Sequence, residues 1–122
     1  MTGPAPSTVV LVAHGSRAEA ANAAHRALAG ELAARTGRRV IPAFLELAEP
    51  SIGEAVDAAV AGGGPVLVLP HFLHAGAHVR EDVPALVATA AARHPGCDVR
   101  VLAPFGDDPA VLDLLAAQLD RS

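Results

Sequence analysis

The sequence predicts an α/β fold in which four parallel strands form one sheet with helices on both faces. Four short runs rich in Val, Leu and Ile alternate with four segments that carry helical patterns. Continuously apolar strands are typical of parallel sheets, because such sheets are buried on both faces. Right-handed crossovers would join the strands. The 122 residues fit a single domain, 1–122, with enough chain to bury a core.

The first strand and helix are expected within residues 7–36. Residues 7–13 (STVVLVA) form a β-branched run that ends at His14, Gly15 and Ser16, which predicts a buried strand entering a loop. Residues 17–36 are rich in Ala and predict a helix that ends at Gly37, with His25 on its polar face. The apolar stripe expected to face the sheet consists of Ala21, Ala24, Leu28 and Leu32.

Two further strands are expected at residues 39–44 and 65–70. Glu46 falls just past the end of the first of these. Ser51 and Glu54 have the capping-box spacing that opens a helix, which should run to about Ala61 before three glycines. The run PVLVLP at 65–70 is bounded by prolines and reads as a third buried strand.

The last third of the chain predicts a loop, a helix, a strand and a final helix. Residues 71–82 (HFLHAGAHVRED) are too polar and His-rich to continue the third strand, so we expect a loop. A fourth strand is expected at 98–103, and Asp108 with Pro109 should begin the last helix. The third helix should bury Val83, Leu86, Val87 and Ala90, and the last helix carries Val111, Leu112, Leu115 and Leu119.

Composition excludes several classes of partner. The formal charge is −4, and the nine basic residues, all Arg, are scattered, so no surface for nucleic acid and no basic membrane helix is expected. Cys97 is the single cysteine, which rules out an intrachain disulfide and a Cys-x-x-Cys site. The first residues do not resemble a signal peptide, and no apolar run is long enough to span a membrane. A cytoplasmic protein that binds a small molecule or another protein is expected.

The rim of the sheet is where chemistry is expected. Ligands of open parallel sheets bind beyond the carboxyl ends of the strands. His14, Glu46 and the histidines that follow the third strand would all project there, giving imidazoles and a carboxylate from separate loops. Such donors suit Co²⁺, Ni²⁺, Fe²⁺ or Zn²⁺, and an incomplete ligand shell leaves room for a substrate. The alternative for each residue is an ordinary role in a turn or on the solvated surface.

Common catalytic motifs are missing from the sequence. His14-Gly15-Ser16 is not a Gly-x-Gly-x-x-Gly fingerprint, no Walker loop occurs, and Ser16 lacks the Gly-x-Ser-x-Gly elbow. Nucleotide binding and serine hydrolysis are therefore set aside. Two classes remain, a metal-handling enzyme and a noncatalytic carrier of a metal or ligand, and residue spacing does not separate them.

Three segments together resemble the small sirohydrochlorin chelatases of the CbiX and SirB type. They are VVLVAHGSR at 9–17, FLELAEPSI at 44–52 and PHFLHAGAHVREDVP at 70–84. The resemblance covers nearly the whole chain and implies a chelatase-like domain. It implies that His14 and His78 are the catalytic pair that binds the metal, with Glu46 as the acidic ligand. Members insert cobalt for cobalamin, iron for sirohaem or nickel in a related pathway, and Co²⁺ followed by Fe²⁺ is expected here.

The resemblance also implies a substrate, an assembly and further contacts. A sirohydrochlorin-type tetrapyrrole carries many carboxylates, for which Arg17 and Arg80 are the adjacent cations. Phe44 and His74 are further expected substrate contacts, and His71 stands, like His74, where many relatives have apolar residues. A chain of this length is similar to one half of the two-domain members, which implies a homodimer that completes the cleft. The metal is a substrate, and no organic cofactor is expected.

Overall fold

The computed structural model describes residues 7–122 and confirms the four-stranded parallel sheet. The strands are β1 (Thr8–Ala13), β2 (Val40–Phe44), β3 (Val66–Pro70) and β4 (Val99–Val101). They are ordered β2-β1-β3-β4. Because β1 pairs with β2 on one side and β3 on the other, the order reverses beside β1, where ligands of such sheets bind. The expectation about a signal peptide falls largely on residues 1–6, which lie outside the described residues.

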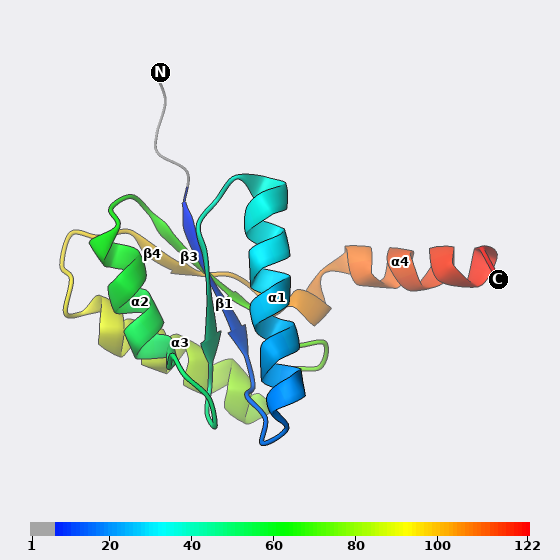
Figure 1. The fold of residues 1–122 in the computed structure, drawn as a ribbon, viewed down its shortest axis with the longest axis horizontal. Coiled ribbons are helices and arrows are strands. Elements are labelled where there is room, and N and C mark those ends of the chain that lie inside the picture. The colour runs from blue at the N-terminus through cyan, green and yellow to red at the C-terminus, as the bar shows by residue number, and fades with distance from the viewer. Residues whose placement is uncertain (1–6) are drawn as a thin grey trace.

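The helices cover the two faces of the sheet unequally (Figure 1). Helices α2 and α3 lie together on one face, whereas α1 lies on the other and α4 projects away from the sheet (Figure 1). The helices are α1 (Glu19–Thr36), α2 (Ile52–Ala61), α3 (Ala77–Ala91) and α4 (Pro109–Asp120), with the 3₁₀ turn η1 (Phe105–Asp107) before α4. Within residues 7–122, no helix is long and apolar enough to cross a membrane.

The core lies between the sheet and the α2–α3 layer. Val10 and Val12 of β1 pack there with Val66 and Val68 of β3, all of them fully buried. Alternate residues of β1, Val9 and Leu11, point to the α1 face, as the strand pleat requires. Each such buried side chain contributes roughly 1.5–3 kcal/mol by leaving water.

The prediction of the buried stripe on α1 is wrong by one position. Asn22, His25 and Ala29 are buried, whereas Ala21 and Ala24 are exposed. A polar contact explains this rotation of the helix: the Nε2 atom of His25 lies 2.8 Å from the carbonyl oxygen of Leu11. A buried imidazole that satisfies a backbone group fixes the rotation of the helix against β1. His25 is therefore not on the polar face, and the apolar stripe predicted for α1 is left largely uncovered.

Helix α3 begins earlier than the sequence suggested. Residues 71–82 were expected to be a loop, but α3 starts at Ala77 after Gly76 as N-cap, so His78 lies in its first turn. Polar residues on the outer side of this helix hid the helical period. Val83, Val87 and Ala90 are buried as predicted, but Leu86 is 42% exposed and points away from the core.

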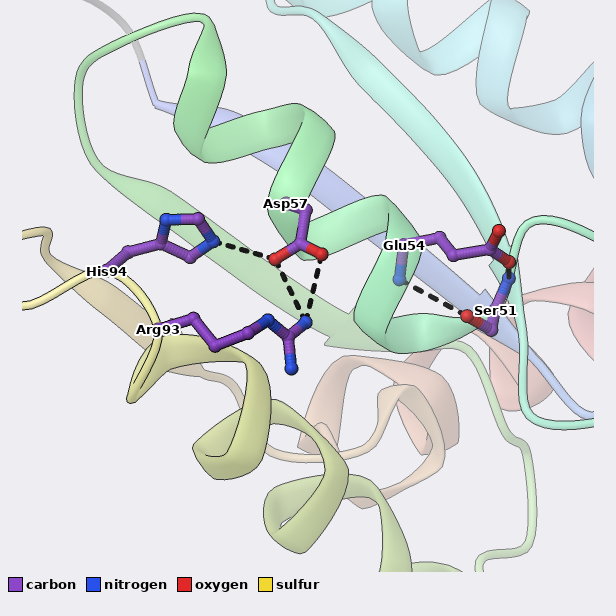
Figure 2. Close-up of polar contacts among 5 residues, drawn as sticks. All are labelled: Ser51, Glu54, Asp57, Arg93 and His94. Carbon is purple, nitrogen blue, oxygen red and sulfur yellow. Dashed lines mark hydrogen bonds and ion pairs between the residues drawn. The ribbon is translucent and has the colours of Figure 1, made fainter.

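Polar contacts at the start and in the middle of α2 are drawn in Figure 2. The predicted capping box is confirmed: Ser51 Oγ accepts from Glu54 N–H at 3.2 Å and Glu54 Oε1 accepts from Ser51 N–H at 2.9 Å. Farther along α2, Asp57 lies 2.7 Å from Nε2 of His94 and 2.9 Å from the guanidinium of Arg93, just beyond α3 (Figure 2). The hydrogen bonds from His94 and then from Arg93 hold the pKa of Asp57 below its ordinary value.

The Asp57 contacts predict a stability that depends on pH. Since the pKa of Asp57 is lower in the folded chain, its contribution is present above the unfolded pKa and is lost as the pH falls through the folded pKa. We expect Asp57→Asn to cost about 0.2–1 kcal/mol at pH 7, since the group is partly exposed, and less at pH 3. Urea denaturation at both pH values measures this cost.

The matched control is Asp98→Asn. Asp98 pairs with Arg100 only two residues away, so much of that contact persists in the unfolded chain and its loss should cost less. An equal cost of Asp57→Asn at pH 7 and pH 3 would contradict the assignment.

Candidate metal and substrate site

A pocket of about 460 Å³ opens beside the carboxyl ends of β1 and β2 and the start of α3. Its polar lining comes from three separate parts of the chain: His14 after β1, Glu46 after β2, and His78 with Asp82 on α3. The apolar lining is Leu45, Val79, Ala85 and Leu86. The pocket therefore brings together His14, Glu46 and His78, the three residues predicted to bind the metal.

The backbone pairing of β1 and β2 continues past both strands and positions His14 beside Glu46. Leu45 N–H donates to the carbonyl of Ala13 at 2.9 Å, and Glu46 N–H donates to that of His14 at 3.1 Å. The side chains follow: Nδ1 of His14 lies 3.7 Å from Oε1 of Glu46, and each side chain is more than half exposed. At that distance the two side chains are neighbours without a direct hydrogen bond, so both groups keep capacity for another ligand.

Gly15 makes this close approach possible. Its φ is +94°, a conformation that L residues with a side chain rarely adopt. A Cβ atom at this position would lie 1.7 Å from the carbonyl oxygen of Glu46. The glycine of the His14-Gly15-Ser16 sequence is thus required by the contact between the two loops.

Asn22 holds the loop that carries His14, and the sequence analysis did not identify it. Its side chain accepts from Ser16 N–H at 2.9 Å and donates to the Ser16 carbonyl at 2.8 Å, while Asn22 itself is 3% exposed. The available signal was an Asn within an Ala-rich helical segment. The buried ring of Phe72 packs against that of His14, with T-shaped geometry and ring centroids 6.2 Å apart.

The candidate metal-binding side chains do not form a closed cluster. Within residues 7–122, no three His, Cys, Asp or Glu side chains come close enough together to hold a metal ion. His14 and Glu46 are neighbours, and His78 lines the same pocket from α3. Imidazole and carboxylate donors suit borderline divalent ions, and an incomplete set leaves coordination positions for a second molecule.

Phe44 does not occupy the place predicted for it. It is 1% exposed and packs under α1, with its ring 5.2 Å from that of His25 and 5.1 Å from the guanidinium carbon of Arg26. The apolar end of β2 is buried because α1 crosses over it. This corrects the expectation that Phe44 faces the substrate.

Arg80 and His74 lie on another side of the rim. The Arg80 guanidinium forms two hydrogen bonds to Asp107, at 2.7 and 2.8 Å, and a third to the carbonyl of Ala75. Asp107 therefore offsets the charge that was expected to attract substrate carboxylates, and raises the pKa of Arg80. His74 lines a recess beside η1 and α4. Arg17 is exposed next to the His14 loop. Substrate contacts by Arg17, His74 and Arg80 stay predictions.

His71 does not line this pocket and instead lies in a groove beside α1. Its ring stacks on that of His25, with centroids 6.2 Å apart and planes 18° from parallel, and lies 5.2 Å from the ring of Phe105. Burial, and then the neighbouring His25, lower the pKa of His71, which favours the neutral ring. His71 therefore belongs to the packing of the α1 face.

Comparison with known proteins gives a consistent result. The family model CbiX matches residues 8–122. The chloroplastic sirohydrochlorin ferrochelatase of Arabidopsis thaliana is 36% identical over 109 residues, which are 88% of this chain and 48% of that protein. The chain spans about half the length of the curated relatives that it matches.

Two crystal structures share the fold. A CbiX protein from Marinobacter aquaeolei VT8 is 35% identical with a TM-score of 0.73, and the match covers 96% of this chain and 100% of that one. The sirohydrochlorin chelatase SirB from Bacillus subtilis subspecies spizizenii, in complex with cobalt, is 29% identical with a TM-score of 0.80. That match covers 94% of this chain and 50% of SirB.

The contact between Gly15 and Glu46 predicts the effect of a single methyl group. Gly15→Ala should destabilise the fold by about 1–3 kcal/mol from the positive φ alone, and the clash should displace Glu46 from His14. Thermal denaturation measures the first effect, and calorimetric titration with Co²⁺ measures the second. Unchanged stability and Co²⁺ affinity would contradict the argument.

The control is Gly30→Ala. Gly30 lies in α1 with open space where a Cβ would be, so alanine there should stabilise the helix by about 0.5–1 kcal/mol and leave Co²⁺ binding unchanged.

Proposed function

The chain belongs to the CbiX family, and we propose that it inserts a divalent metal ion into a sirohydrochlorin-type tetrapyrrole. The observation that carries this proposal is the convergence of His14, Glu46 and His78 on one open pocket at the rim of the sheet. The relatives that are named as chelatases of sirohydrochlorin supply the substrate class.

The chemistry of insertion assigns a role to each residue. A divalent ion replaces two pyrrole N–H protons, so the site must release the ion to the macrocycle and accept two protons. We propose that His14 and His78 bind the incoming ion and accept those protons, since imidazole can do either near neutral pH. Glu46, 3.7 Å from His14, is proposed as the acidic ligand. An open ligand set favours this role, because a saturated cage would retain the ion.

We propose Co²⁺ as the metal substrate, with Fe²⁺ second. One relative is named a ferrochelatase, and SirB has been crystallised with cobalt. Ni²⁺ accepts the same ligands and is an alternative that the assay below separates. Arg17, exposed beside the His14 loop, is proposed to bind a substrate carboxylate.

We also propose a homodimer, which is supported by two apolar surfaces that do not meet within one chain. Helix α4 carries Leu112, Leu115 and Leu119, which are 53–74% exposed, and no residue of this fully described helix is buried. The first surface consists of this stripe with Leu73, around an open recess of about 590 Å³.

The second surface lies beside α1. A groove of about 300 Å³ runs along Ala21, Ala24 and Leu28, the stripe that the sheet leaves uncovered. Next to it, Leu67 and Leu69 of β3 are only half-buried, because no helix covers that half of the sheet face (Figure 1). We propose that α4 of each copy covers this face of the other, an arrangement that closes with two-fold symmetry.

We propose a reducing compartment, the cytoplasm, for the protein. Cys97 is exposed and is the single cysteine of the sequence, so the fold does not depend on an intramolecular disulfide. A reducing compartment is compatible with such a chain.

The activity is tested by anaerobic absorbance of sirohydrochlorin mixed with the protein and, separately, Co²⁺, Fe²⁺ or Ni²⁺. We expect protein-dependent acceleration over metal-only mixtures, fastest with Co²⁺. His14→Ala and His78→Ala should each slow insertion at least about 100-fold, as loss of a proton acceptor does. His94→Ala is the control and should insert metal at the normal rate, because His94 contacts Asp57 far from the pocket.

Two outcomes would overturn the assignment. Full activity of His78→Ala would remove that residue from the mechanism. A tight complex of the protein with metal or tetrapyrrole and no acceleration would indicate a carrier.

The dimer is tested by sedimentation equilibrium at micromolar concentration. Leu115→Glu should shift the protein to monomers, because a carboxylate would be buried in the proposed interface. Leu114→Glu is a matched control: both leucines are 53% exposed, but Leu114 lies off the stripe, so the dimer should persist. A monomeric wild type, or equal dissociation of both variants, would refute the proposed interface.

A further inference from the structure

Asp82 is the one polar residue of the pocket that the proposed mechanism does not use. It lies on α3 four residues after His78, so the two residues occupy the same side of the helix one turn apart. Glu81 and Arg80 do not line this pocket. Along α3 the pocket is thus lined by His78 and Asp82, with Val79 between them, and by apolar residues farther along the helix.

The carboxylate of Asp82 is not used by a contact within the fold. Among residues 7–122, three other aspartates are engaged in ion pairs: Asp107 binds Arg80, Asp57 binds Arg93 and His94, and Asp98 binds Arg100. Asp82 is exposed and has no hydrogen bond or ion pair with any of the described residues. An unpaired carboxylate contributes nothing to the fold through a contact, so its place in the pocket is open to a cationic ligand.

Electrostatics at the start of α3 gives a second reason for a carboxylate. His78 is in the first turn, where the helix dipole is positive, and no acidic residue lies in that turn. A divalent ion bound by His78 is therefore opposed by the helix end, and Glu46 alone supplies one negative charge. Asp82 brings the pocket to two carboxylates, which match the charge of the ion.

We propose that Asp82 is a metal-binding residue of this site, holding the hydrated divalent ion next to His78 before insertion. The two carboxylates attract M²⁺ strongly. They attract the product less, because the metal charge is then balanced within the macrocycle by the two deprotonated pyrrole nitrogens. The balance is M²⁺ plus the free-base tetrapyrrole giving the metallated tetrapyrrole plus two protons. This inference rests on the proposed function for the insertion step, but metal binding is testable without it.

The test compares Asp82→Asn with Glu81→Gln. Both substitutions remove one negative charge from adjacent positions of α3, but only Asp82 lines the pocket. In calorimetric titrations with Co²⁺ alone, Asp82→Asn should weaken binding about tenfold or more, as loss of groups around a metal typically does, and Glu81→Gln should not. Asp82→Glu should restore most of the affinity. Thermal denaturation of each variant should give the wild-type midpoint.

In the insertion assay, Asp82→Asn should raise the KM for the metal and leave the KM for the tetrapyrrole unchanged. Equal Co²⁺ affinity of Asp82→Asn and wild type, or equal losses in Asp82→Asn and Glu81→Gln, would overturn the proposal. If Asp82→Asn weakens Co²⁺ binding but the wild type does not accelerate insertion, the metal-binding role of Asp82 stands and the proposed chelatase function fails.

Discussion

The pairing of β1 with two parallel neighbours is the constraint on which the rest of this structure depends. It places the carboxyl ends of β1, β2 and β3 at one edge, and the backbone hydrogen bonds between β1 and β2 continue as far as His14 and Glu46. Two side chains 32 positions apart in sequence therefore become neighbours through backbone geometry. Gly15 tolerates the closeness because it has no Cβ, and Asn22 fixes the loop from α1.

The pocket that results is open and is lined by two imidazoles and two carboxylates. His14 and Glu46 are more than half exposed, and His78 and Asp82 line the same pocket from the first turns of α3. Metal sites that stabilise a fold surround the ion with four donors and exclude water. The proposed metal insertion instead requires ligands that can exchange, and side chains that retain access to solvent are consistent with that proposal.

The uneven coverage of the sheet leaves the apolar surfaces on which the proposed homodimer is based. Helices α2 and α3 bury one face, whereas α1 alone covers the other and buries two polar residues, His25 against β1 and Asn22 against the loop that follows it. As a result, an apolar stripe of α1 stays in contact with solvent. The leucines of α4 are also exposed. Monomeric proteins rarely expose large apolar patches in water, and these two surfaces therefore support the proposed homodimer.

The sequence by itself determined the parallel α/β fold, the capping box of α2 and the position of His14, Glu46 and His78 around one pocket at the rim, because strand runs, caps and chain order are local or topological. The tertiary structure alone decided which side of α1 meets the sheet, that Phe44 is buried and that Asp107 binds Arg80. Helical periodicity identifies residues that share a face, but hydrogen bonds between distant segments select the face that is buried. In α1 the bond from His25 to Leu11 made that selection. Likewise, no local pattern shows that Asp107, 27 residues from Arg80, offsets its charge, or that α4 leaves the sheet.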